Sequence, residues 1–289
     1  MTTVKPSGVH AVPVESRLPP PRRLSRFARY LLVAGPGLVV AFADTEAGSI
    51  TTAATSGAQF GMKLVLLQLL LIVPLFVIQE MTVRLGIISG KGHAELIRER
   101  YGMGWATISL TTMLITNVAG LITEFIGIAG VAMIFGLPVA PLVMLSALVL
   151  LAIVFTGRYR RAEVAALGLC LLELLFIPAA FAAHPQWSTV LHEGILGSQP
   201  LANRDYLLLV AGNIGAVIMP WMIFYQQSAT VDKRLRLQDL NYSRFDTALG
   251  AVATQVIMIA IIVTTAATLY VNHISVNDAA HAALALMPL

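Results

Sequence analysis

Charged residues and cysteine are both scarce in this chain of 289 residues. Only 12% of the residues are charged, whereas about 25% are charged in an ordinary soluble domain, so the chain cannot cover itself with a polar surface. Hydrophobic residues make up 57% of the chain and the mean hydropathy is +0.80, which indicates a polytopic, all-α membrane protein. The single cysteine, Cys170, excludes a disulfide within the chain and a metal–thiolate cluster.

Motifs of hydrolytic and nucleotide-binding enzymes are missing as well. The six histidines form no His-Glu-x-x-His pair, and neither a Gly-x-Ser-x-Gly nor a P-loop pattern occurs. An intramembrane hydrolase is therefore disfavoured, and we expect no enzymatic activity, no catalytic residue and no bound cofactor. The net charge of +4 does not indicate a nucleic-acid partner, because the positions of the basic residues have a better explanation.

The basic residues follow the positive-inside rule over seven predicted spans. With a cytoplasmic N-terminus, all but two of the 19 lysines and arginines fall in cytoplasmic segments, the exceptions being Lys63 and Arg204. A missed or invented span among the first six would remove this asymmetry. The predicted spans are Leu31–Ala58, Leu64–Val83, Ile108–Phe135, Pro141–Phe155, Ala162–Ala183, Tyr206–Ser228 and Thr247–Val271.

Two segments flank the predicted spans. Residues 1–30 contain five prolines and no apolar run, which predicts a disordered cytoplasmic tail. Residues 31–289 are the predicted transmembrane transporter domain, and its last segment, Asn277–Leu289, is alanine-rich and amphipathic and too short for another span.

Two acidic residues, Asp44 and Glu46, interrupt the first predicted span near the middle of the membrane. Each acidic group at a helix centre costs roughly 2.5–3.5 kcal/mol, so the pair opposes insertion by about 5–7 kcal/mol. Gly48 and Ser49 weaken the helix further. A spanning helix interrupted by acids and small residues is how transporters build a cation site. The alternative is a surface loop between two buried helices of a soluble protein, which the composition disfavours.

A proline interrupts the sixth predicted span. Pro220 removes a backbone hydrogen bond and clashes with the carbonyl of Ala216, four residues earlier. A carbonyl freed in this way needs another partner in lipid, and a bound cation is one such partner. Met219 offers a soft thioether beside the opening. Two interrupted helices five spans apart indicate an inverted five-helix repeat with a site at the repeat interface.

Short motifs around both interruptions resemble those of the natural resistance-associated macrophage protein (NRAMP) family of divalent metal transporters. They are Gly35-Pro-Gly, Glu46-Ala-Gly-Ser, Gly57-Ala-Gln-Phe-Gly, Gln79, Arg84-Leu-Gly-Ile, Gly90 and, in the sixth span, Gly215-Ala-Val-Ile-Met-Pro. The resemblance is strong over residues 35–103 and 208–235. It implies a LeuT-type inverted-repeat bundle, with about seven of the ten or more expected spans present. It also implies import of manganese or ferrous iron, usually with protons.

The resemblance further implies a set of metal ligands. In the family, an Asp and an Asn in an Asp-Pro-Gly-Asn break bind the metal, together with an alanine carbonyl and a methionine sulfur of the sixth helix. The corresponding positions here are Glu46, Ser49, Ala216 and Met219. The proline of the family motif is replaced by Ala47.

Two other departures from the family pattern affect residues that handle protons. Trp221 stands where the family has a histidine, and Leu121 stands where it has a proton-handling Asp three residues before Glu124. The metal-binding positions of the family pattern are thus kept in modified form, and its proton-handling residues are mostly lost. This combination is typical of an outlying branch of the family. Two intramembrane acids remain open: Glu124 joins a proton or water path or pairs with a neighbouring helix, and Asp44 is an outer-shell acid, a proton carrier or a structural partner.

These observations predict a secondary transporter that imports a divalent metal ion, Mn²⁺ or Fe²⁺, by alternating access. The alternatives are a Mg²⁺ transporter of a related branch and an amino-acid carrier of the same fold, whose substrate carboxylate Glu46 and Asp44 would repel. The expected partners are the metal ion and the lipid bilayer of a bacterial plasma membrane, and the only other ion expected to be coupled to transport is the proton. The sequence does not indicate an oligomeric state. We expect the chain to be a fragment holding the first repeat and the start of the second, the alternative being natural loss of the later spans.

Overall fold

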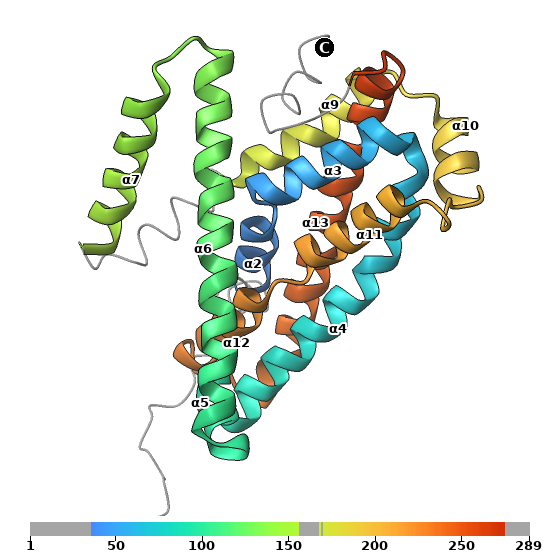
Figure 1. Cartoon of the computed structure of the whole chain (residues 1–289). Coiled ribbons are helices and arrows are strands. Elements are labelled where there is room, and N and C mark those ends of the chain that lie inside the picture. The colour runs from blue at the N-terminus through green and yellow to red at the C-terminus, as the bar shows by residue number, and fades with distance from the viewer. Residues whose placement is uncertain (1–35, 156–167, 169, 275–289) are drawn as a thin grey trace, which may run out of the picture.

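The computed structural model describes residues 36–155, 168 and 170–274. Every regular element within these ranges is helical, so the predicted all-α class is confirmed (Figure 1). The predicted tail, residues 1–30, and the predicted final segment, residues 277–289, lie outside the described residues.

The predicted spans correspond to helices whose ends differ by several residues from the expected ones. The first span is divided into α2 (Pro36–Asp44) and α3 (Ala47–Phe60), and the sixth into α11 (Arg204–Val217) and α12 (Pro220–Asp232). Of the fifth predicted span, residues 162–167 and 169 lie outside the described part of the chain. The other elements are η1 (Gly61–Leu64), α4 (Val65–Ser89), α5 (His93–Tyr101), α6 (Met103–Ile134), α7 (Val139–Phe155), η2 (Leu171–Leu175), α9 (Phe176–Ala182), α10 (Trp187–Thr189), η3 (Val190–Ile195), η4 (Leu237–Asp239), α13 (Leu240–Thr265) and η5 (Ala266–Tyr270).

Helix α13 is the central element of the bundle. It packs against α2, α3, α4 and α9, and most of its residues from Thr254 onward are buried. Glycines allow its closest contacts: a Cβ on Gly250 would lie 2.8 Å from the carbonyl oxygen of Gly37, and a Cβ on Gly37 would lie 2.9 Å from the backbone of Thr247. The broken first span is therefore held backbone to backbone against α13.

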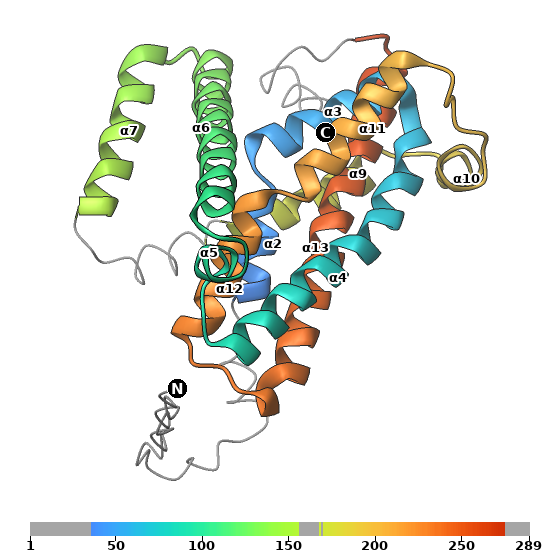
Figure 2. The same cartoon turned by 60° about the horizontal axis from the view of Figure 1, so that its bottom comes forward.

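Helices α6 and α7 form a hairpin that stands beside this bundle (Figure 2). Along α6 only Ala106, Gly130 and Ala132 are buried, and α7 has no buried residue. Among the described residues, four helical runs are long and apolar enough to cross a membrane, namely Ala47–Ser89, Met103–Ile134, Arg204–Asp232 and Leu237–Tyr270. The first run joins α3, η1 and α4, between which the chain turns sharply (Figure 1).

Candidate functional site

The first interruption leaves two residues outside the helices. Helix α2 ends at Asp44, and the hydroxyl of Thr45 turns back to the carbonyl of Ala41 at 3.4 Å. Glu46 is extended, with φ −81° and ψ 172°, and α3 begins at Ala47. The predicted break is therefore confirmed. Because α2 ends here and α3 begins here, carbonyls of one half-helix and N–H groups of the other face the same region.

The second interruption also consists of two residues, Ile218 and Met219. Helix α11 ends at Val217, and Pro220 is the first residue of α12, a position where its missing N–H costs nothing. The carbonyl of Ala216 in the last turn of α11 accepts a hydrogen bond of 3.3 Å from the Ser49 hydroxyl. This contact joins α3 to α11, so the two breaks lie together in space although 167 residues separate the bonded pair.

The four residues that align with the family ligands are grouped around the two breaks, on different sides. Ser49 and Ala216 are in direct contact. The thioether of Met219 accepts a hydrogen bond from the indole N–H of Trp221 at 3.3 Å. Glu46 instead extends toward α6, because a Cβ on Gly120 would lie 3.4 Å from its Oε2 atom.

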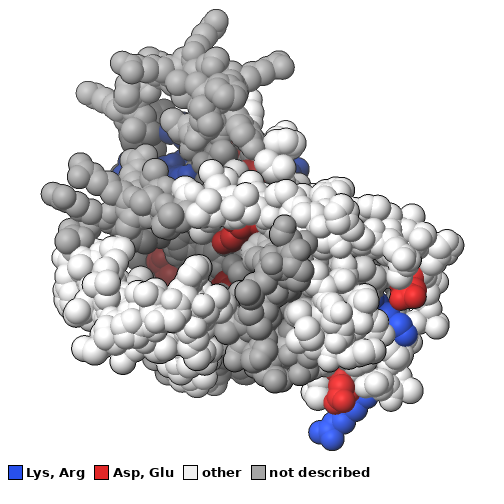
Figure 3. Space-filling model, turned by 90° about the horizontal axis from the view of Figure 1, so that it is seen from above, with Lys and Arg blue, Asp and Glu red and all other residues white. Residues whose placement is uncertain are grey.

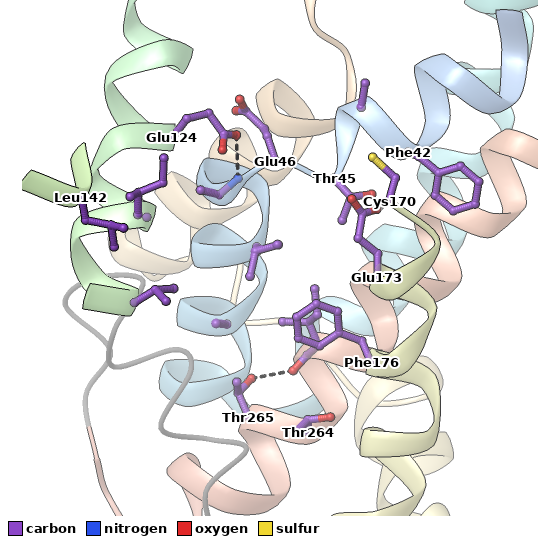
Figure 4. Close-up of a pocket in the computed structure, with 18 residues that line it drawn as sticks. Phe42, Thr45, Glu46, Glu124, Leu142, Cys170, Glu173, Phe176, Thr264 and Thr265 are labelled. Carbon is purple, nitrogen blue, oxygen red and sulfur yellow. Dashed lines mark hydrogen bonds between the residues drawn. The ribbon is translucent and has the colours of Figure 1, made fainter. Parts of the chain in front are cut away.

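A cavity of about 580 Å³ lies on the α6 side of the first break. Its walls come from α2, α3, α6, α7, η2, α9 and α13, and three of the lining residues are acidic: Glu46, Glu124 and Glu173 (Figure 4). Acidic side chains are visible in a hollow on the face seen from above (Figure 3). Ser49, Ala216 and Met219 do not line this cavity. Of the predicted ligands, only Glu46 reaches it.

Glu124 connects the cavity wall to the broken helix. Its Oε1 atom accepts a hydrogen bond of 3.0 Å from the backbone N–H of Ala47 (Figure 4). Of the two roles left open by the sequence, this contact is a pairing with a neighbouring helix. On the opposite wall, Glu173 and Cys170 point toward Thr45 (Figure 4). Carboxylates from two other segments thus flank the interrupted region on both sides.

A network of fully buried polar side chains holds α3, α4 and α11 together beyond the breaks. The amide of Asn213 donates to the hydroxyl of Ser56 at 2.8 Å and to the carbonyl of Leu209 at 2.7 Å, and its oxygen accepts from Gln68 at 2.6 Å. Sequence reasoning missed this network. The only signal was a single amide residue in each of two apolar runs, which periodicity cannot pair.

Two further polar residues lie in the interior of the bundle. Asp44 is 1% exposed, and Gln255 in α13 is 0% exposed. Within the described ranges, no group of three or more His, Cys, Asp or Glu residues is placed to hold a metal ion. A metal at the breaks would therefore depend on mixed donors: carboxylate, hydroxyl, backbone carbonyl and thioether.

Comparison with known proteins agrees with this architecture. A family model described as natural resistance-associated macrophage protein-like matches residues 37–289. The chain is 31% identical over 281 residues to a divalent metal cation transporter MntH of Ralstonia nicotianae, and 28% identical over 283 residues to one of Brucella suis. These alignments cover 93% and 92% of this chain but 63% and 60% of the relatives, so the chain spans less than two thirds of their length.

Solved structures share the fold. A crystal structure of a manganese transporter from Eremococcus coleocola superimposes with a TM-score of 0.75 at 20% identity, covering 92% of this chain and 63% of that one. A second structure of the same transporter, in complex with an aromatic bis-isothiourea substituted compound, has a TM-score of 0.71. The arrangement of the described helices is therefore that of these transporters.

Proposed function

Because this chain belongs to the natural resistance-associated macrophage protein family, we propose that it imports a divalent metal ion, Mn²⁺ or Fe²⁺, by alternating access around the two breaks. The observation that carries the proposal is the bond between the Ser49 hydroxyl and the Ala216 carbonyl, which brings the two breaks together. Interrupted helices that meet in the membrane interior are the usual setting of a cation site in secondary transporters. The relatives' names, divalent metal cation transporter, support the same substrate class.

Four residues are proposed as metal ligands: Glu46, Ser49, Ala216 and Met219. Glu46 supplies the negative charge that dominates affinity, and Ser49 and Ala216 supply neutral oxygens. Met219 supplies a thioether, which softer transition ions accept and Mg²⁺ or Ca²⁺ do not. Glu46 extends toward α6 in this conformation, so binding would require its carboxylate to swing toward Ser49.

The test of the ligand set is Mn²⁺ uptake by proteoliposomes that contain the protein. Glu46→Gln should abolish uptake of every divalent ion, whereas Glu193→Gln, the same change at an exposed site, should have no effect. Met219→Ala should weaken Mn²⁺ uptake and let excess Mg²⁺ compete, and Met144→Ala on the exposed face of α7 is its matched control. Full Mn²⁺ uptake by Glu46→Gln would reject the proposal.

A Mg²⁺ transporter is the second candidate, favoured by one contact. The sulfur of Met219 already accepts the Trp221 N–H at 3.3 Å, and with the sulfur engaged only oxygen donors remain at the breaks. The same assay separates the candidates. If Mg²⁺ inhibits Mn²⁺ uptake by the wild type as strongly as it inhibits uptake by Met219→Ala, then Met219 confers no selectivity and the Mg²⁺ candidate is favoured.

We propose that the chain is not an enzyme, that it needs no resident cofactor and that proton coupling is weak. Weak proton coupling is inferred from Leu121 and Trp221, which stand where the family places proton-handling residues, and the absence of enzymatic activity is inferred from the missing hydrolase and P-loop motifs. The measurement is acidification of the vesicle lumen during metal uptake. A stoichiometric proton signal would contradict this part of the proposal.

The proposed orientation has a cytoplasmic N-terminus, in a bacterial plasma membrane. In the described part of the chain, basic residues lie at two opposite ends of the helix bundle, and one end carries more of them than the other. One end is formed by α5 and the turn from α12 to η4, and the opposite end by η1 and the start of α11 (Figure 1). The first end carries Arg84, Lys91, Arg98, Arg100, Lys233, Arg234, Arg236 and Arg244, and the second Lys63 and Arg204. This asymmetry supports placing the first end in the cytoplasm.

A further inference from the structure

Two side chains in the bundle interior have no hydrogen-bond partner among the described residues. Neither carboxylate oxygen of Asp44 is bonded, and neither the amide nitrogen nor the amide oxygen of Gln255 is bonded. Asp44 is 1% exposed and Gln255 is 0% exposed. Neither residue lines the acidic cavity on the α6 side. Buried polar groups of native proteins are nearly always paired, so two orphaned side chains in one region call for a ligand.

Two hydrogen bonds between α2 and α13 fix how the two helices are aligned. The N–H of Gly37 donates to the Asp246 carboxylate at 2.8 Å. Four residues later on α2, the carbonyl of Ala41 accepts a hydrogen bond of 3.0 Å from the hydroxyl of Thr254, which follows Asp246 on α13. Residue numbers rise in the same direction on both helices, so α2 and α13 run parallel. Asp44 and Gln255 each lie within one turn of the Ala41–Thr254 contact.

A buried apolar cluster indicates on which face of α2 and of α13 the two unpaired side chains lie. Val40 in α2 and Ala251 in α13 belong to the same cluster, with Val217 at the end of α11. Asp44 and Gln255 each follow their cluster residue by four positions, which places them on the same helix face, one turn further on. Because the helices run parallel, both orphaned side chains lie one turn beyond the same end of this cluster, which also contains the last residue of α11.

The electrostatics of this region favour a cation. Helix α2 ends at Asp44 and α11 ends at Val217, so the negative ends of two half-helix dipoles face the same region. Within the described part of the chain, no salt bridge involves Asp44. An isolated carboxylate in an apolar interior is unfavourable unless a positive charge neutralises it. One carboxylate with a neutral amide is balanced by a single positive charge.

We propose that Asp44 and Gln255 form a binding site for a small monovalent cation, Na⁺, separate from the divalent-metal ligands at Glu46 and Ser49. The Asp44 carboxylate neutralises the ion, and the Gln255 amide oxygen and carbonyls at the ends of α2 and α11 complete an all-oxygen donor set. Hard alkali and alkaline-earth cations prefer such oxygen donors. The site does not depend on the proposed metal transport.

The test is binding of radioactive Na⁺ to the protein in lipid nanodiscs, at constant pH and without divalent ions. The wild type should bind Na⁺ saturably, and Na⁺ should raise its melting temperature by mass action. Asp44→Asn, which keeps the side-chain shape, should weaken Na⁺ binding by at least about tenfold because it removes the charged ligand. Gln255→Met, of similar length but without the oxygen, should weaken it as well. Asp205→Asn, the same change at an exposed site, should bind as the wild type does.

Several results would overturn the site. They are the absence of saturable Na⁺ binding by the wild type, equal binding by Asp44→Asn and the wild type, or equal binding by a folded Gln255→Met and the wild type. A proton as the occupant would appear as a melting temperature that depends on pH and not on Na⁺, which would also reject the proposal. Mn²⁺ binding is measured on the same wild-type sample, so a failure of the metal-transport proposal would be seen separately.

Discussion

The carboxylate of Glu124 accepts a hydrogen bond of 3.0 Å from the backbone N–H of Ala47, 77 residues away in the chain. Ala47 is the first residue of α3, and Glu46, which precedes it, makes no side-chain cap bond. Glu124 therefore caps α3 from another helix and satisfies one of its orphan N–H groups. A proline at this position, as in the family motif, has no N–H to donate. This bond thus depends on Ala47, one of the departures seen in the sequence.

The cap can be tested by a double-mutant cycle on Glu124 and Ala47. Glu124→Leu should lower the free energy of unfolding by about 1 kcal/mol, the usual value of a helix cap, while Glu124→Gln keeps an acceptor oxygen and should lose less. Ala47→Pro removes the donor, so Glu124→Leu should cost little in that background. Thermal unfolding in detergent provides the measurement. Equal losses from Glu124→Leu in both backgrounds would show that the bond contributes nothing.

The buried amide of Asn213 should be indispensable for the packing of α3 against α11 and α4. Asn213→Leu leaves Gln68 and the Ser56 hydroxyl without their partner and should destabilise the protein by about 1–3 kcal/mol. Asn117→Leu, the same change on the exposed face of α6, is the control and should be nearly neutral. Denaturation curves of both variants give the free energies of unfolding to be compared. Comparable stability of the two variants would argue against a structural role of the network.

Gly57 marks the closest approach of α3 to α13. A Cβ at this position would overlap the hydroxyl of Thr265 and the carbonyl of Ile262, and the latter is rigid backbone. Gly57→Ala should therefore destabilise the protein by about 1–3 kcal/mol, as overpacking does. In α6 a Cβ on Gly104 meets no atom within 4 Å, so Gly104→Ala should stabilise that helix by about 0.5–1 kcal/mol. Melting temperatures that shift the same way in both variants would contradict this reading.

The indole of Trp221 should compete with a bound metal ion for the Met219 sulfur. Trp221→Phe keeps the aromatic ring but removes the N–H that bonds the sulfur at 3.3 Å. We expect Mn²⁺ to bind a few-fold more tightly to this variant and Mg²⁺ to bind unchanged, since only the softer ion uses a thioether. Calorimetric titration of both ions measures the difference. Weaker Mn²⁺ binding by Trp221→Phe would mean that the indole supports the site.

The class of the protein and the positions of both interruptions could be predicted from composition and local sequence alone. Composition decides whether a chain can cover itself with polar surface, and that needs no knowledge of packing. The breaks were equally accessible because their causes are local: two acids and a glycine around Glu46, and a proline at Pro220. The ligand positions followed from short motifs, and the structure adds that one of the implied pairs, Ser49 and Ala216, is in contact.

The side of the broken helix on which each polar group lies could not be predicted, because it depends on how the helices pack. Glu46 extends toward α6 and lines a cavity with Glu124, while Asp44, two residues earlier, is buried in the bundle interior, as is Gln255 of α13. Helical periodicity relates residues three or four positions apart on one helix. The bond from Ala47 to Glu124 and the alignment of α2 with α13 join residues far apart in the chain. They depend on how closely glycine-rich helix faces approach, which is a property of the packed bundle and not of any single segment.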